Sequence, residues 1–382
     1  MIDEFKTVSV IAIRRAVRRE LLAIVCAFVL CGILTAGLWP FHAPRNEVTW
    51  LKNRNGLRFG RYGGIQSSGT FNTLNPDEET AVSVEIWLQP RFIGDSNTVL
   101  AFYSHNSPKH FSLRQSHADL VVRSDIRNGP HRKAAAIYLA DVFRKGTPVF
   151  ISFASGAHGS AAYIDGALAA TFPQFIVARG ALTGRLVVGD SPVQSDNWQG
   201  RLYGLAIYGR DLTAAQVLRD YRTWTGTGRP DFSADERGVA LYLFRERTGN
   251  VVHNSAGGIV DLYIPGRYTI LNEKFLEPSW KEFRNDWGYW KNVFINITGF
   301  VPFGFFVCAL FSIGWRINRP GLTTILLGAS VSLSIEILQA FLPTRQSGMT
   351  DLITNTLGTV LGVAIYRLVA YFSSQRRLPM GN

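Results

Sequence analysis

Four long apolar segments constrain this chain more than any other feature of its sequence. They cover Leu21–Trp39, Val293–Trp315, Leu322–Leu342 and Leu352–Phe372. Each is about twenty residues long, which is enough for a helix to cross the ~30 Å hydrocarbon core of a bilayer. The sequence therefore predicts a membrane protein with four transmembrane helices.

The chain between the first and second segments has a different character. Residues 45–285 are polar and rich in glycine and in short strand-like runs, and they are numerous enough to bury a core of their own. All three cysteines (Cys26, Cys31 and Cys308) lie in apolar segments, so this region has no disulfide. We expect a multidomain membrane protein in which an all-α four-helix transmembrane bundle accompanies an all-β sandwich.

Arginines at the ends of the apolar segments predict the orientation in the membrane. Short basic flanks favour the cytoplasmic side. This places residues 1–20 and 373–382 in the cytoplasm, and residues 45–285 and 343–351 outside. The arginines concerned are Arg14, Arg15, Arg18, Arg19, Arg316, Arg319, Arg376 and Arg377.

The first apolar segment could also be interpreted as a cleaved signal peptide. Thr35, Ala36 and Gly37 are small, as at the cleavage site of a signal peptide. The apolar run is long for a signal peptide, however, and the bulky Trp39-Pro40-Phe41 follows it, so we favour an uncleaved anchor at 21–39. The net charge of +12 is not gathered on a basic helix with interleaved aromatics, so no nucleic acid partner is expected.

Polar residues in and beside the third segment indicate more than an anchor. Glu336 lies in an otherwise apolar stretch, and Gln339 follows three residues later on the same helix face. A carboxylate within the bilayer costs a few kcal/mol or more, so it is rarely found there without a hydrogen-bonding partner or a function. Arg345 follows just beyond the end of the helix.

The second and fourth segments begin with the same pattern. Asn292, Asn296 and Gly299 recur as Asp351, Asn355 and Gly358, at i, i+4 and i+7, a spacing that puts each set on one helix face. One reading is a binding pocket in the outer half of the bundle. The other is interhelical packing, in which asparagine bonds across helices and glycine allows close approach. The predicted pocket is lined by Asn292, Asn296, Glu336, Gln339, Arg345, Asp351 and Asn355; the predicted packing glycines are Gly299, Gly304, Gly358 and Gly362.

These residues resemble the VanZ-like family of bacterial membrane proteins over residues 290–372, with helices at about 293–315, 322–342 and 352–372. The resemblance rests on Asn296, Val301-Pro302-Phe303-Gly304, Glu336-x-x-Gln339, Arg345 and Asp351-x-x-x-Asn355-x-x-Gly358-x-x-x-Gly362. The family often has a further acid between the arginine and the last aspartate, and residues 346–350 contain none. The resemblance implies a link to glycopeptide (teicoplanin) resistance, through the namesake member, and no established reaction.

Short strands and turns dominate residues 45–285. Strands are predicted at 81–88, 150–153, 162–166 and 186–190, the second and third as a hairpin-like pair. One short helix is predicted at 214–221, with Thr213 as its N-cap and Gln216 completing a capping box. Many short strands with one short helix are typical of a β-sandwich.

This region resembles the laminin-G-like, concanavalin A-like jelly rolls. The resemblance rests on Leu57-Arg-Phe59, Val84-Glu-Ile-Trp87, Tyr163-Ile-Asp-Gly166, and above all the run from Trp198 to Thr213. It implies binding of a glycan or protein, sometimes with calcium. Trp87, Trp198 and Trp224 are candidate sugar contacts, with core packing as the alternative. Asp190 and Asp196 are weak calcium candidates, with solvated turns as the alternative; otherwise no metal or cofactor is expected.

Three functions are consistent with these features. The first is a non-enzymatic protein of the bacterial plasma membrane, whose sandwich binds an envelope glycan or protein and whose bundle binds the headgroup of an amphiphile among the membrane lipids. The second is an integral-membrane enzyme acting on a lipid-linked cell-wall precursor. The sequence has no nucleophile elbow, phosphate loop or metal-ligand spacing to support it, so no catalytic residue is assigned. The third is an adhesive domain on a purely structural anchor.

Overall fold

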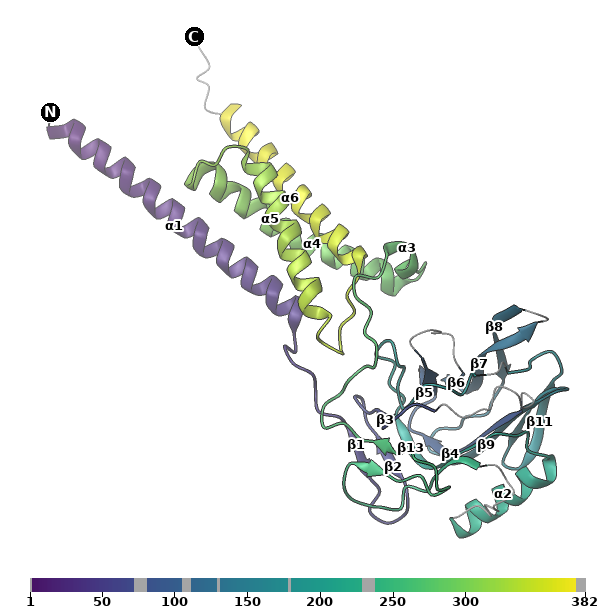
Figure 1. Ribbon diagram of the computed structural model, residues 1–382. Helices are drawn as coiled ribbons and strands as arrows, with labels where there is room; N and C mark the ends of the chain where they lie inside the picture. Colours follow the sequence, from purple (N-terminus) through teal and green to yellow (C-terminus); the bar gives the residue numbers. More distant parts are fainter. Residues whose placement is uncertain are drawn as a thin grey trace. The chain divides into compact units, whose positions relative to one another are not determined.

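The computed structural model describes residues 2–71, 81–104, 111–128, 131–177, 180–228 and 238–375 (Figure 1). It divides into two compact units, one formed by residues 1–42 with 273–382 and the other by Ala43–Asn272. Arg376 and Arg377 lie outside the described residues, and the side chains of Arg14 and Arg15 lie outside the described side chains.

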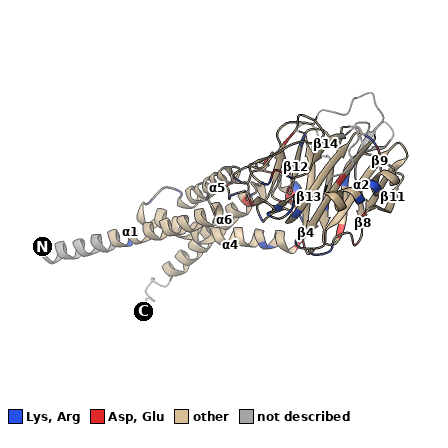
Figure 2. Ribbon diagram, turned by 90° about the horizontal axis from the view of Figure 1, so that it is seen from below, with Lys and Arg blue, Asp and Glu red and all other residues tan. Residues whose placement is uncertain are grey.

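The first unit is helical. Four stretches of its described residues are long and apolar enough to cross a membrane: Ala16–Leu38, Trp287–Gly314, Pro320–Gln339 and Met349–Gln375. The prediction of four spans is therefore confirmed, and charged residues are sparse along these helices (Figure 2). The elements are α1 (Ile2–Leu38), α3 (Ser279–Glu282), α4 (Trp287–Ala309), the π-helical η2 (Leu310–Gly314), α5 (Pro320–Gln339) and α6 (Met349–Gln375).

The third span ends earlier than its apolar sequence indicates. α5 stops at Gln339, and the N–H of Leu342 bonds to the carbonyl of Gln339 in a tight turn. Pro343 follows, and the residue before a proline is disfavoured in helical conformation. Residues 340–342, predicted as helix, therefore belong to the loop that leads into α6.

Glycines allow α4 and α6 to pack at close range. A Cβ at Gly358 would meet the carbonyl oxygen of Ile297, and a Cβ at Gly362 would meet that of Val301. From the opposite helix, a Cβ at Gly304 would meet the backbone of Thr359. A buried apolar cluster centred on Phe300, Phe303, Val307 and Ile335 continues this packing toward side chains of α1.

The second unit is built from antiparallel strands. They are β1 (Val48–Trp50), β2 (Leu57–Phe59), β3 (Ile65–Ser67), β4 (Val82–Pro90), β5 (Ser96–Tyr103), β6 (Ser112–Ser116), β7 (Asp119–Asn128), β8 (His131–Leu139), β9 (Val149–Gly156), β10 (Gly159–Ile164), β11 (Ala167–Phe172), β12 (Arg185–Val188), β13 (Gly200–Tyr208), β14 (Gly238–Tyr242), β15 (Val251–Val252) and β16 (Leu262–Tyr263).

The described strands form two sheets that enclose one core. One sheet has the order β1-β2-β13-β4-β9-β10-β11, with β14 also paired to β13, and the other has the order β15-β16-β3-β12-β5-β6-β7-β8. Val84 and Ile86 of the first sheet and Leu100 and Phe102 of the second belong to the core between them. The predicted sandwich is confirmed, as is the hairpin of β9 and β10, whose register joins Gly156 to Gly159.

The helix α2 (Ala214–Thr227) covers the outer face of the first sheet (Figure 1). Its Val217 and Trp224 form a second buried cluster with residues of β9 and β13. The side chain of Thr213 accepts the N–H of Gln216, whose own side chain accepts the N–H of Thr213, so the predicted capping box is present. The helix ends at Gly228, which has a φ of 75° that suits glycine.

Candidate functional site

The buried carboxyl group of Glu336 holds the loop between α5 and α6. Glu336 is 1% exposed, and its Oε2 accepts the backbone N–H of Gly348 at 2.8 Å. One turn later, Gln339 donates its side-chain N–H to the carbonyl of Gly37 at 2.8 Å. The acid–amide pair predicted from the sequence therefore points into the bundle, where it fixes both the loop and the end of α1.

Arg345 is engaged with the carboxyl end of α1. Its guanidinium donates to the carbonyl of Trp39 at 2.8 Å and 3.1 Å, and to that of Ala36 at 3.0 Å. Carbonyls at the end of a helix lack intrahelical partners and attract cations. Three donations to one helix end make Arg345 a cap of α1 in this structure.

Asp351 and Asn355 face two different neighbours. Asp351 accepts the side-chain N–H of Asn296 in α4 at 2.8 Å, and Asn355 donates to the hydroxyl of Ser332 in α5 at 2.9 Å. The first turn of α6 is thereby tied to both adjacent helices.

The α4 residues of the repeated pattern do not all face inward. Asn292 and Gly299 are exposed, and a Cβ at Gly299 would have nothing within 4 Å. The buried face of α4 instead runs through Phe300, Phe303 and Gly304. Of the three α4 residues that share the spacing seen on α6, only Asn296 therefore lies at the site.

Glu282 is a site residue that the sequence analysis did not identify. Its carboxylate accepts the N–H of Thr350 at 2.9 Å, in the first turn of α6. Backbone bonds between Glu277 and the pair Ser347 and Met349 hold this segment against the loop. A Cβ at Gly348 would collide with the Glu282 carboxylate, so this glycine leaves room for it.

Three carboxyl groups from three separate segments thus meet at the start of α6. Glu336, Asp351 and Glu282 lie within electrostatic range of one another, and Arg345 is near Asp351. Within the described parts of the chain, no group of three or more His, Cys, Asp or Glu residues is arranged to hold a metal ion. The side-chain oxygens of Gln339, Thr344 and Thr350 are buried without a protein partner, which leaves further hydrogen-bonding capacity in this region.

The three tryptophans of the sandwich occupy different environments. Trp198 and Trp224 are 1% and 0% exposed, the first in the core and the second on the face of α2 that packs on the sheet, so neither ring is open to a ligand in this conformation. Trp87 is partly exposed, with its ring centroid 4.9 Å from that of Tyr203. The Arg54 guanidinium lies 4.0 Å from the Tyr203 ring centroid and 5.6 Å from that of Trp87.

The two aspartates considered for calcium are bonded within the sandwich. Asp190 is buried and accepts the N–H groups of Ser191 and Asp196 and the hydroxyl of Tyr268. Burial raises the pKa of Asp190 to about 7, outweighing these hydrogen bonds. Asp196 accepts the hydroxyl of Thr98 and pairs with Arg114. Both carboxyl groups hold the loop before β13 in place.

Comparison with known proteins bears on each unit. A family model described as VanZ/LLP1 matches residues 239–370, and one described as the concanavalin A-like lectin/glucanases superfamily matches residues 59–218. The chain carries a VanZ-like domain and a concanavalin A-like domain. Both resemblances seen in the sequence are thereby confirmed. No curated protein matches the chain.

Solved structures similar to the chain match it at low identity. They include a candidate carbohydrate binding protein from Bacteroides ovatus ATCC 8483 (13% identity, 58% of this chain and 63% of that chain, TM-score 0.39). A SAP-like pentraxin from Limulus polyphemus has 13% identity (58% and 95%, TM-score 0.35). The CBM40 of a Ruminococcus gnavus IT-sialidase, bound to α2,3-sialyllactose, has 12% identity (43% and 95%, TM-score 0.33). At these values the matches carry no information about a ligand of this chain.

The VanZ-like match also covers Glu282. It begins at residue 239, upstream of the 290 inferred from the motifs, so Glu282 and its segment fall inside it. The VanZ-like domain therefore has an acid beside the loop after all, contributed by α3 rather than by residues 346–350.

Proposed function

We propose that this protein is a multi-pass protein of a bacterial plasma membrane that binds an amphiphile headgroup with its VanZ-like domain and an envelope glycan with its concanavalin A-like domain. Its termini are cytoplasmic, and residues 43–272 and the loop before α6 face outward. The arginines Arg18, Arg19, Arg316 and Arg319 at the other ends of the helices support this orientation.

The observation that carries the headgroup proposal is the convergence of Glu282, Glu336 and Asp351 at the start of α6. Ionised carboxylates only accept hydrogen bonds, and each oxygen has two acceptor positions, so the one or two bonds that each carboxyl group makes here leave other positions open. The cation near Asp351, Arg345, is already engaged with the end of α1. The site therefore favours a headgroup rich in N–H or O–H donors, such as an amine or a sugar, over a phosphate.

Replacement of Glu282 by glutamine tests this proposal. The variant keeps an oxygen for the N–H of Thr350 but lacks the charge, and a hydrogen bond to a charged group is worth about 1.5–3 kcal/mol, so headgroup affinity should fall about tenfold or more. We expect cells carrying Glu282→Gln to become more sensitive to a teicoplanin-type glycopeptide at unchanged protein abundance.

The matched control is Glu277→Gln. Glu277 lies in the same segment but pairs with Lys274, so this change removes the same charge outside the cluster and should leave sensitivity unchanged. Unaltered sensitivity of the Glu282→Gln cells, or equal sensitivity of both variants, would contradict the proposal.

A separate observation favours an acidic glycan as the ligand of the concanavalin A-like domain. Trp87 offers a partly exposed aromatic ring, tilted by 51° against the ring of the buried Tyr203, and the exposed Arg54 lies over both rings. Beside them, Gln89 accepts the hydroxyl of Tyr203. Aromatic faces stack on sugar rings, while a guanidinium pairs with a carboxylate in a charge-assisted bond.

We expect Arg54→Gln to lower retention of the full-length protein on alginate, an acidic polysaccharide, by about tenfold, the loss of one charge-assisted hydrogen bond. Arg144→Gln removes another exposed charge of the same unit and should bind as the wild type does. The measurement is affinity electrophoresis or a pull-down, with neutral dextran for comparison. Equal losses of retention for the two variants would show that net charge alone causes the effect, which would contradict the proposal.

A further inference from the structure

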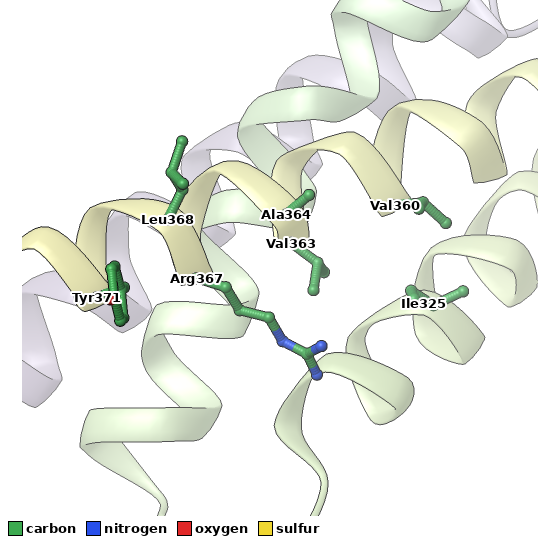
Figure 3. A pocket seen from close by; sticks show the side chains of 7 residues that line it. All are labelled: Ile325, Val360, Val363, Ala364, Arg367, Leu368 and Tyr371. Atoms are coloured by element: carbon green, nitrogen blue, oxygen red, sulfur yellow. The ribbon is translucent and has the colours of Figure 1, made fainter.

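A groove on the surface of the bundle lies away from the carboxylate site. It has a volume of about 470 Å³ and runs between α5 and α6 (Figure 3). Its walls are apolar and include Ile325, Val360 and Leu368. Arg367 and Tyr371, further along α6, are the polar residues of its lining.

Arg367 introduces a positive charge into this apolar groove. Its side chain extends from α6 toward the helix that carries Ile325 (Figure 3). A Cβ at Gly321 would collide with the guanidinium, so this glycine lets Arg367 lie against the first turn of α5. No hydrogen bond or ion pair joins Arg367 to another residue in the described parts of the chain, and no Asp or Glu occurs in residues 310–328 or 360–375.

The position of Arg367 along α6 places it near a membrane interface. It is sixteen residues beyond Asp351, or about 24 Å at 1.5 Å per residue. The hydrocarbon core is about 30 Å thick, so if Asp351 is near one interface, Arg367 is near the other. A long arginine side chain at this depth reaches the level of lipid headgroups. Arg316 and Arg319, in the loop between η2 and α5, belong to the same end of the bundle.

We propose that this groove binds an anionic glycerophospholipid, with an acyl chain along the apolar walls and the phosphate paired with Arg367. A guanidinium binds a phosphate through two parallel hydrogen bonds. A helix from a second copy would bury the cation instead. The segments of α5 and α6 at this depth offer it no carboxylate, and the one acid of α1 near this end, Glu20, has Arg18 and Arg19 directly before it. The site lies at the end of the bundle opposite to the carboxylate cluster and does not rest on the function proposed there.

The test uses the full-length protein, purified in detergent and incubated with equal amounts of phosphatidylglycerol and phosphatidylcholine of the same chain length. Native mass spectrometry counts the retained lipids. A basic residue near an anionic membrane surface is worth about 1 kcal/mol, so Arg367→Gln should reduce the preference for phosphatidylglycerol about fivefold. Arg367→Lys, which keeps the charge, should retain part of the preference.

Two further variants separate the parts of the proposal. Arg319→Gln removes a charge from the same end of the bundle but outside the groove, and it should leave the preference unchanged. Ala364→Phe fills the groove and should reduce retention of both lipids while the charge remains. All of these side chains are exposed, and thermal unfolding verifies that each variant is folded.

Three results would overturn the proposal. Equal losses in Arg367→Gln and Arg319→Gln would show a diffuse attraction without a site. Unchanged retention in Ala364→Phe would show that no acyl chain lies in the groove. Displacement of phosphatidylglycerol by millimolar glycerol 3-phosphate would show that the phosphate alone is bound.

Discussion

Gly362→Ala should destabilise the helical unit by about 3 kcal/mol, the upper part of the range for an overpacked core. The new methyl group would be directed at the carbonyl oxygen of Val301 and the backbone nitrogen of Phe305. Neither is the end of a flexible side chain, so α4 and α6 would have to separate. Thermal unfolding of the full-length protein in detergent, followed by helical circular dichroism, measures the loss.

Gly299→Ala is the matched control on α4. A Cβ at Gly299 has nothing within 4 Å, and alanine is the better helix former by up to about 1 kcal/mol in water. This variant should be as stable as the wild type or slightly more so. If the two glycines tolerated alanine equally, the close crossing of α4 and α6 would be refuted.

The second large effect concerns the anchor of the loop. Glu336→Ala leaves the buried N–H of Gly348 without its acceptor, at a cost of about 1–3 kcal/mol, and opens a cavity within the bundle. We expect the loop and the start of α6 to loosen, because both depend on this bond. Hydrogen exchange of a peptide covering residues 343–352 should accelerate, while peptides from the sandwich keep their wild-type rates.

Glu336→Gln separates the shape of this side chain from its charge. Glutamine retains an oxygen for the Gly348 N–H, so the exchange rates should stay close to those of the wild type. If the carboxylate also contacts a headgroup, resistance to a teicoplanin-type glycopeptide should fall all the same. A fully functional glutamine variant would instead restrict Glu336 to holding the loop.

The elements that were predicted correctly depend on patterns within short stretches of chain. Thr213 and Gln216 form a capping box because both partners lie within one helical turn. The four spans follow from unbroken apolar runs. Even these patterns mislead at their edges, as α5 shows, since its apolar run continues to Leu342 while Pro343 ends the helix at Gln339.

Which face of a helix or strand is buried was harder to predict. Asn292 and Gly299 share their spacing with Asp351 and Gly358, yet they face outward, because the bulk of Phe300 and Phe303 determines which side of α4 is buried. Likewise, a tryptophan that could stack on a sugar and one that fills a core look alike in sequence. Only packing separates the partly exposed Trp87 from the buried Trp198.

The sequence by itself determined that this is a membrane protein with a β-sandwich between its first and second spans, because hydrophobic length and strand alternation are local properties of a chain. Tertiary structure decided the composition of the candidate site. Glu282 is separated from Glu336 by more than fifty residues and two helices, and no periodicity connects them. They come together because α3 packs against the loop, where Gly348 donates to one carboxylate and leaves space for the other.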